Sequence, residues 1–398
     1  MTFQFITQGI LMPAVSIFGI IGNSITIKVL KDRDVKLNKE FRDVLSGLAT
    51  FDNLLLIFTF LLFSLPSLSK TYKDEYFALT VPMLYPATNI FTTASSYMTV
   101  AVGVNRFLDM SLEWQNLPRI KNGVMQSIIV FIVSTILNLP RCFEFEYRKS
   151  ISYENITLDN GSSINVTNTV YEIGISELRS NENYVRDYTL ITNSVVMVIL
   201  PTSIMLISSC LIYRQMLSSM RLGIFTNAQE QARRRRNRNI NIMLIGIVVL
   251  FLVCHLGEVV IAIYELTQSY RNGKKNPFPD WAGNMVVVNH LLIVINSSLN
   301  FVIYCKDIVF RQTVKKMLNS RKEANHVALI RNQMVLETQR TNPCNSQQRE
   351  IKLDQKGDEP NKKETLPKVH TSVQTNKNDV EDPQAIIVRR IEEMEVIL

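Results

Sequence analysis

Enzyme motifs and internal repeats are missing from this chain of 398 residues. It contains no His-Glu-x-x-His and no Gly-x-Ser-x-Gly, the spacings that a catalytic zinc ion or a serine nucleophile needs. Its four histidines are far apart in the sequence: His255, His290, His326 and His370. We therefore expect a protein that is not an enzyme. The missing repeat also argues against a secondary transporter, since many transporters are built from two related halves.

Long apolar stretches are what the sequence does have. Of its residues 46% are hydrophobic, yet the mean hydropathy is only +0.09, so apolar stretches must alternate with polar ones. A bilayer core of ~30 Å is crossed by ~20 apolar residues in a helix. Seven stretches meet this requirement: 9–30, 44–65, 81–108, 123–140, 188–213, 240–266 and 282–305. The pattern predicts an all-α membrane protein, a seven-transmembrane helix bundle.

Polar segments flank the predicted bundle. Residues 1–8 form a short segment ahead of the first span, and residues 9–318 make up the seven-helix domain. At about 306–318, apolar residues alternate with basic ones, which predicts an amphipathic helix on the membrane surface. Residues 319–398 are polar and poor in aromatics, a composition typical of disordered segments. We predict a disordered cytoplasmic tail there.

Basic residues near the membrane lie mostly on one side of the predicted spans. They include Lys31, Arg42, Arg119 and the run Arg233 to Arg236. Because positively charged loops stay in the cytoplasm, we expect a multi-pass protein of the plasma membrane with its N-terminus outside and its C-terminus inside. The net charge of +8 is then explained by loops beside anionic lipids, and we expect no nucleic-acid partner.

The predicted long outer loop carries three Asn-x-Ser/Thr sequences, at Asn155, Asn160 and Asn165. Such sequences accept N-linked glycans where they face the outside of the cell, so we predict a glycoprotein. A loop rich in Asn and Thr also produces these sequences by chance, and that alternative stays open at this point.

Several polar residues lie inside the predicted spans, where an unpaired polar group is costly. They are Asn23, Asp52, Ser95, Arg106, Asn296, Ser297 and Asn300. Because each needs a hydrogen-bond partner or water, we expect them to meet around one hydrated cavity.

At these positions the chain resembles the rhodopsin-type (class A) G-protein-coupled receptors. The residues that carry the resemblance are Gly22-Asn23, Leu48-Ala49-Thr-Phe-Asp52, Asn105-Arg106-Phe107, Pro201 and Asn296-Ser-Ser-Leu-Asn300-Phe-Val-Ile-Tyr304. Finer features resemble invertebrate FMRFamide-type neuropeptide receptors: Leu139-Pro140-Arg141-Cys142-Phe143-Glu144, Phe251-Leu-Val-Cys254-His255 and the Asn296 to Phe301 stretch. The resemblance implies a receptor for an extracellular, FMRFamide-like peptide that signals through a heterotrimeric G protein, with arrestin and membrane lipids as further partners. A secondary transporter, or a degenerate receptor-like protein without signalling, is the alternative.

The resemblance also implies a role for the polar residues of the core. In the family, the position of Asp52 holds a sodium ion and waters, together with partners that match Ser95, Asn296, Ser297 and Asn300. We expect the same network here, with Asp52 and Ser95 as ligands of a possible sodium ion and no other cofactor. A hydrogen-bonded network without an ion is the alternative.

Arg106 resembles the arginine that meets the G protein when the sixth helix moves outward. Its acidic neighbour in the family is replaced by Asn105, which cannot hold a guanidinium by charge. We therefore expect a looser latch and higher basal activity. The resemblance implies further activation roles for Asn23, for His255 at the toggle position of the sixth helix, and for Tyr304 at the end of the seventh.

The resemblance places the ligand site in the outer half of the bundle. The residues expected to line it are Thr88, Asn89, Thr92, Glu258 and His290. Glu258 would pair with the arginine of an Arg-Phe-amide peptide, and the others would form hydrogen bonds to the ligand.

Cysteine is scarce, and one expected disulfide is missing. Family members link the third helix to the second outer loop, but the third-helix position falls near Val81 and no cysteine lies between residues 143 and 187. We expect a more mobile loop and a less stable outer half. Glu144 and Glu146, at the mouth of that loop, are expected to steer a cationic peptide inward or merely to solvate the loop.

Overall fold

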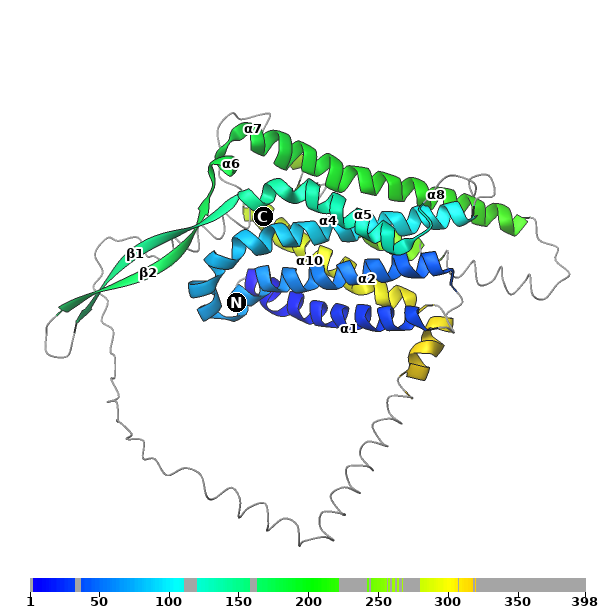
Figure 1. The fold of residues 1–398 in the computed structure, drawn as a ribbon, viewed down its shortest axis with the longest axis horizontal. Coiled ribbons are helices and arrows are strands. Elements are labelled where there is room, and N and C mark those ends of the chain that lie inside the picture. The colour runs from blue at the N-terminus through cyan, green and yellow to red at the C-terminus, as the bar shows by residue number, and fades with distance from the viewer. Residues whose placement is uncertain are drawn as a thin grey trace, which may run out of the picture. The chain divides into compact units, whose positions relative to one another are not determined.

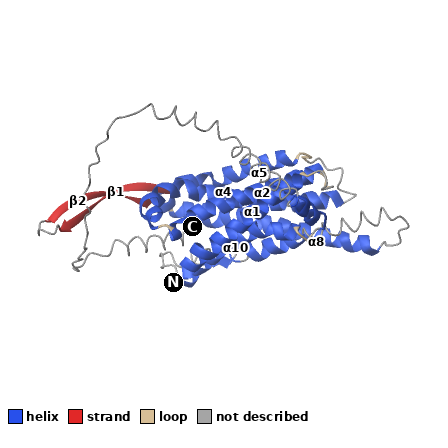
Figure 2. Ribbon diagram, turned by 90° about the horizontal axis from the view of Figure 1, so that it is seen from below, coloured by secondary structure: helices blue, strands red, loops and turns tan. Residues whose placement is uncertain are grey.

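Helices dominate the part of the chain that the computed structural model describes (Figure 1). The described residues are 3–32, 37–110, 120–157, 163–221, 242, 245–255, 257, 260–261, 263–264, 267, 280–306, 308–317 and 319. Their long helices lie side by side and form a bundle, and a β-hairpin projects beyond one end of it (Figures 1 and 2). We call this end the hairpin end and the other one the opposite end.

The first two helices run through the predicted first and second spans. α1 (Met12–Lys31) continues a π-helical segment, η1 (Phe5–Leu11), and has Lys28 and Lys31 in its last turn. Basic residues at that position interact favourably with the negative end of the helix dipole. α2 (Lys39–Thr59) continues through η2 (Phe60–Ser64) into α3 (Leu65–Leu68).

α4 (Phe77–Met110), the third long helix, follows the short η3 (Tyr72–Tyr76). Its 34 residues correspond to roughly 50 Å of helix, more than a bilayer core requires. It carries Pro82 and Pro86 inside the helix. α4 is also rich in Thr and Ser, and it contacts α2, α5 and α8. α4 therefore packs against three neighbouring helices.

α5 (Gly123–Asn138) begins at a capping residue and exposes most of its apolar side chains. The Asn122 side chain accepts hydrogen bonds from the backbone N–H groups of Val124 and Met125 at 3.1 and 3.3 Å. α5 ends in a 3₁₀ turn, η4 (Leu139–Phe143). Its exposed residues include Val124, Ile128, Ile132 and Ile136, which suits a helix whose outer face meets lipid.

The predicted long loop after α5 contains regular structure that the sequence analysis did not anticipate. β1 (Phe145–Thr157) and β2 (Ser163–Ile175) pair as an antiparallel hairpin in which Phe145 stands opposite Ile175. Two short helices, α6 (Glu177–Ser180) and α7 (Glu182–Tyr184), lead into η5 (Val185–Ile199) and α8 (Leu200–Arg221). The fifth predicted span lies within η5 and α8.

The last described helices complete the bundle. Ile245–His255 is an apolar helix inside the predicted sixth span. Val248 and Phe251 on it form a cluster with Val100 of α4 and Met205 of α8. α10 (Asp280–Tyr304) contacts α1 and α2. A further helical segment covers residues 308–317.

Within the described part of the chain, five helical stretches are long and apolar enough to cross a membrane: Phe5–Lys31, Lys39–Leu68, Gly123–Phe143, Ser194–Gln215 and Trp281–Tyr304. The other two predicted spans correspond to the more polar α4 and to the sixth helix, of which the structure describes Ile245–His255 and a few further residues.

Candidate functional site

Asp52 lies at the centre of a polar network in the middle of the bundle. Its side chain is completely buried. Asp52 Oδ1 accepts a hydrogen bond from Ser95 Oγ at 2.5 Å, and Oδ2 accepts one from Asn300 Nδ2 at 2.8 Å. One carboxylate therefore joins α2, α4 and α10, because a buried charge is tolerated only where hydrogen bonds compensate it.

Asn23 extends the network to α1. Its Nδ2 donates to the backbone carbonyl of Ser297 at 3.1 Å, and both residues are fully buried. The helices can approach this closely because glycine stands on α1: a Cβ on Gly22 would lie 2.8 Å from the Cβ of Phe301. The structure thus brings together Asn23, Asp52, Ser95, Ser297 and Asn300. Their role in activation stays a prediction.

The oxygens of this network suit a small cation or water molecules. Among the described residues, Asn23 Oδ1, Asn300 Oδ1 and the Tyr304 hydroxyl are buried and have no hydrogen-bond partner. Oxygen donors around one carboxylate match what a hard cation such as sodium prefers, and buried waters satisfy the same groups. Asn296, on the same helix as Ser297 and Asn300, is also buried.

A cavity of about 110 Å³ lies near the hairpin end, and we call it the outer pocket. It is lined by four of the five residues predicted to bind ligand and by His255: Thr88, Asn89, Thr92, His255 and His290. The fifth, Glu258, lies outside the described residues. Asn289, Arg141 and Ser96 add polar groups to the lining that the sequence analysis did not select.

Aromatic contacts and helix bonds fix the groups around the outer pocket. The His290 ring stacks on Phe63 with 4.3 Å between centroids, and His255 packs against Phe251 at 4.1 Å. Thr88 and Thr92 donate their hydroxyl protons to backbone carbonyls one turn earlier, both at 2.8 Å. Their oxygen lone pairs therefore remain as acceptors toward the pocket.

A second polar cluster, which sequence reasoning missed, closes the hairpin end of the bundle. We call it the buried clamp, and it consists of Tyr85, Arg141, Glu144, Arg179 and Tyr184. Arg141 Nη1 donates to the Tyr85 hydroxyl at 2.5 Å, and its guanidinium lies 5.6 Å from the centre of the Tyr85 ring. This pair ties the end of α5 to α4.

Glu144 connects the clamp to the far end of the loop. Glu144 Oε2 lies 3.4 Å from Arg179 Nη1, and the side chains of the two residues are 0% and 7% exposed. Glu144 Oε1 accepts a hydrogen bond from the Tyr184 hydroxyl at 2.7 Å. Burial, together with that bond, raises the pKa of Tyr184, so the phenol stays a neutral donor. The expectation that Glu144 steers ligand or solvates the loop is therefore wrong, because its carboxylate is buried and paired.

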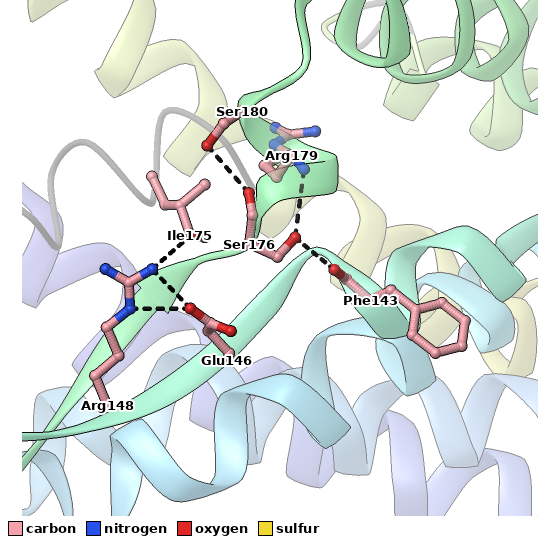
Figure 3. A network of polar contacts seen from close by, with 7 residues as sticks. All are labelled: Phe143, Glu146, Arg148, Ile175, Ser176, Arg179 and Ser180. Carbon is pink, nitrogen blue, oxygen red and sulfur yellow. Dashed lines mark hydrogen bonds and ion pairs between the residues drawn. The ribbon is translucent and has the colours of Figure 1, made fainter.

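Further hydrogen bonds hold the base of the hairpin (Figure 3). Ser176 Oγ donates to the Phe143 carbonyl at 2.5 Å and accepts from the Arg179 backbone N–H at 3.3 Å. Glu146 is exposed and binds Arg148 at 2.7 Å, so it does fit the predicted position on the surface of the loop.

All four cysteines among the described residues are free thiols: Cys142, Cys210, Cys254 and Cys305. The loop is thus joined to α4 in another way. Phe145, the first residue of β1, packs edge-on against Tyr85 at 5.1 Å between ring centroids. Tyr85 lies one helical turn beyond Val81, where the missing cysteine was expected. The clamp therefore connects the same two parts of the chain as the missing disulfide would.

The opposite end of α4 carries Asn105 and Arg106. Asn105 Nδ2 donates to Gln126 Oε1 of α5 at 2.6 Å, and Gln126 Nε2 donates to the Ile120 carbonyl at 2.6 Å. Asn105 thus has a neutral partner on a neighbouring helix, and Arg106 is partly buried. No pattern in the sequence pointed to Gln126, because the contact joins residues 21 positions apart.

Two of the three predicted glycosylation residues lie in the hairpin. Asn155 on β1 stands directly opposite Asn165 on β2, and Asn160 lies outside the described residues. Asn155 and Asn165 thus belong to the hairpin that projects from the bundle (Figure 1).

These features define a class of protein: a multi-pass helical bundle with a buried polar network and a pocket at one end. Comparison with known families agrees, because residues 22–304 match the family model described as 7 transmembrane receptor (rhodopsin family). The match covers most of the chain, and the chain belongs to this family of multi-pass membrane receptors. The predicted seven-transmembrane fold is thereby confirmed, together with the predicted family. Members of this family are in general not enzymes.

Three curated relatives refine the comparison. The chain is 27% identical to an FMRFamide receptor of Drosophila melanogaster over 322 residues, 79% of this chain and 53% of the relative. It is 24% identical to the probable G-protein coupled receptor frpr-1 of Caenorhabditis elegans, over 82% of this chain and 83% of the relative. It is 22% identical to the sex peptide receptor-related protein 2 of the same nematode, over 78% of this chain and 71% of the relative. The chain spans about half the length of the first of these relatives.

Proposed function

We propose that this chain is a receptor for an extracellular, FMRFamide-like neuropeptide and that it activates a heterotrimeric G protein. The observation that supports the proposal most directly is the position of the Asp52 network. It joins α2, α4 and α10 through hydrogen bonds of 2.5 and 2.8 Å, between a pocket at the hairpin end and Arg106 at the opposite end. Two sites joined by one rearranging bundle are what a receptor needs, since agonist and G protein must favour the same state.

The size of the outer pocket supports a ligand that enters with one end. A cavity of about 110 Å³ is small beside the roughly 300–1,000 Å³ of sites that enclose a whole small molecule. A peptide would insert a terminal group and leave the rest on the surface near the hairpin. Thr88, Asn89, Thr92 and His290 would form hydrogen bonds to that group, and Glu258 would pair with an arginine next to it.

A sodium ion fits the donor set of the Asp52 network in the resting state. Asp52 and Ser95 would hold it, with Asn300 as a further oxygen donor. A bound cation would favour the arrangement in which the carboxylate stays ionised between α2, α4 and α10. Asn105, whose amide donates to Gln126 at 2.6 Å, stands where the family has an acidic residue, and a neutral side chain at this position would favour basal activity.

The hairpin end faces outside in this proposal, and the opposite end meets the G protein, arrestin and the lipids of the inner leaflet. The three sequons test the orientation. Treatment of the expressed protein with an N-glycosidase should lower its mass, and Asn155→Gln, Asn160→Gln and Asn165→Gln together should abolish the shift. A glycan-free protein at the cell surface would leave the orientation to be decided by accessibility of an epitope at each terminus.

The deciding experiment measures calcium and cAMP in cells that express the full chain and receive a library of amidated invertebrate neuropeptides. A response to Arg-Phe-amide peptides that is lost in Arg106→Ala, at equal surface expression, supports the proposal. His290→Ala should raise the half-maximal peptide concentration about tenfold, since a ligand hydrogen bond is worth about 1 kcal/mol or more. Ile132→Ala, on the exposed face of α5, is the matched control and should respond normally. Silence of a surface-expressed chain toward all peptides contradicts the proposal and favours a receptor-like protein without signalling.

A further inference from the structure

A second and larger cavity lies at the opposite end of the bundle, between α1, α2 and α5. Its volume is about 510 Å³, within the range of sites that bind small molecules. We call it the inner groove. It is lined by residues from the end of α1, the first half of α2 and the start of α5: Ile27, Leu30, Lys31, Arg42, Asp43, Ser46, Gly47, Thr50, Phe51, Val124 and Ser127.

Close packing of α5 on α2 forms one wall of this groove. A Cβ on Gly123 would lie 2.6 Å from the Glu40 carbonyl oxygen and 2.8 Å from Asp43 Cβ. A Cβ on Gly47 would likewise collide with Ser127 Oγ. Such contacts hold the start of α5 close against α2, and the groove lies between this pair of helices and the end of α1.

The groove has a cationic end. Lys31 and Arg42 contribute two positive charges to its lining, and Asp43 contributes one negative charge. Arg42 Nε is buried and has no hydrogen-bond partner among the described residues. A buried guanidinium N–H without an acceptor is unfavourable, and a phosphate oxygen is the acceptor that guanidinium groups bind best.

The rest of the groove is apolar and continues onto a lipid-facing surface. Leu30 and Phe51 are buried in its floor. Val124 at its edge is 54% exposed, and Ile128, one turn further along α5, is 47% exposed. Apolar side chains that line the way out of a cationic pocket suit a ligand with a charged head and a hydrocarbon tail.

We propose that the inner groove binds one anionic phospholipid. The phosphate lies between Arg42 and Lys31, and the first part of an acyl chain runs over Val124 and Ile128. The leaflet follows from the orientation in the proposed function: the groove faces the cytoplasmic leaflet, which carries the anionic lipids. Lipid binding itself requires neither a peptide agonist nor a G protein, so it can be tested independently of signalling.

The test is native mass spectrometry of the purified full chain, titrated with phosphatidylserine or with phosphatidylcholine that has the same acyl chains. We expect the first bound phosphatidylserine to be preferred over phosphatidylcholine. Arg42→Gln should weaken phosphatidylserine binding roughly tenfold, the effect of losing one charge-assisted hydrogen bond. It should weaken phosphatidylcholine binding less, because the choline of that lipid already balances the charge of its phosphate. Lys39→Gln is the matched control, because Lys39 is exposed at the start of α2 and does not line the groove.

Two further variants separate this proposal from a general effect of charge or from misfolding. Asp43→Asn removes the opposing carboxylate and should strengthen phosphatidylserine binding. Thr50→Trp fills the groove at an exposed position and should weaken the binding of the first lipid of either kind. An equal loss in Lys39→Gln and Arg42→Gln, no gain in Asp43→Asn, or full displacement by soluble glycerophosphoserine at equal concentration would each overturn the proposal.

Discussion

The Glu144–Arg179 ion pair offers a sharp test of how the hairpin end is stabilised. The substitution Glu144→Gln keeps the size of the side chain and an oxygen that can accept from the Tyr184 hydroxyl, but it removes the charge. Arg179, whose side chain is 7% exposed, then carries a buried charge without its carboxylate. Breaking a buried pair in this way typically costs about 3–5 kcal/mol.

The assay is thermal unfolding of the purified protein in lipid nanodiscs at one fixed scan rate. At ~2 cal/mol/K of unfolding entropy per residue, 1 kcal/mol corresponds to roughly 1–2 °C in Tm for a chain of this size, so Glu144→Gln should lower Tm by about 3 °C or more. The fixed rate is needed because membrane proteins often unfold irreversibly. Glu146→Gln is the control: it removes the same charge two residues away, from a pair with Arg148 whose side chains are 50% and 65% exposed. An exposed pair contributes about 0–1 kcal/mol, so the control should shift Tm little.

The double variant Glu144→Gln with Arg179→Met tests whether the loss of stability comes from the charge left on Arg179. If the cost arises from an uncompensated charge, removing both partners should destabilise the protein by much less than the sum of the two single changes. Equal shifts in Glu144→Gln and Glu146→Gln, or costs that simply add in the double variant, would refute the reasoning that a buried ion pair holds the loop.

Three further predictions follow from other contacts. Asn105→Asp should lower basal G-protein activation by severalfold, because the new carboxylate can pair with the neighbouring Arg106. The measurement is nucleotide exchange without agonist, and unchanged basal exchange at equal expression would contradict this prediction. Gly123→Ala should destabilise the protein by about 1–3 kcal/mol in the same unfolding assay, since overpacked positions cost that much. Gly103→Ala is the control and should be tolerated, because the nearest neighbour of the added Cβ would lie at 3.4 Å. Asp52→Asn should abolish any decrease of agonist affinity by sodium chloride relative to choline chloride in radioligand binding, and a persisting sodium effect would place the ion elsewhere.

The sequence predicted the membrane spans well because their length is set by the bilayer and their composition by the lack of water inside it. Even the more polar α4 was found, since its apolar residues extend far enough. The Asp52 network could be anticipated through the resemblance to a family, since a carboxylate in a span needs partners and few polar residues were available.

The buried clamp could not be predicted in the same way. Glu144 and Arg179 are 35 positions apart and lie in a polar segment, where a charged residue is usually solvated. The two residues come together only through the antiparallel register of the hairpin. This register places Phe145 opposite Ile175 and so brings Glu144 and Arg179, which flank the two strands, close to each other. The Asn105–Gln126 bond escaped prediction for a similar reason, because the orientation of α5 about its own axis is not encoded in its apolar composition.

The buried clamp contacts α4 next to its two prolines. Pro82 and Pro86 lack backbone N–H groups, so the carbonyls of Ala78 and Pro82 lose their usual partners and the helix is easier to bend there. Tyr85, to whose hydroxyl Arg141 donates a hydrogen bond, lies between Pro86 and the hairpin end of the helix. Movement of the hairpin would therefore reach α4 at the position where this helix bends most easily. The rest of α4 extends from there to Arg106, so a bend at the prolines would displace Arg106 at the opposite end.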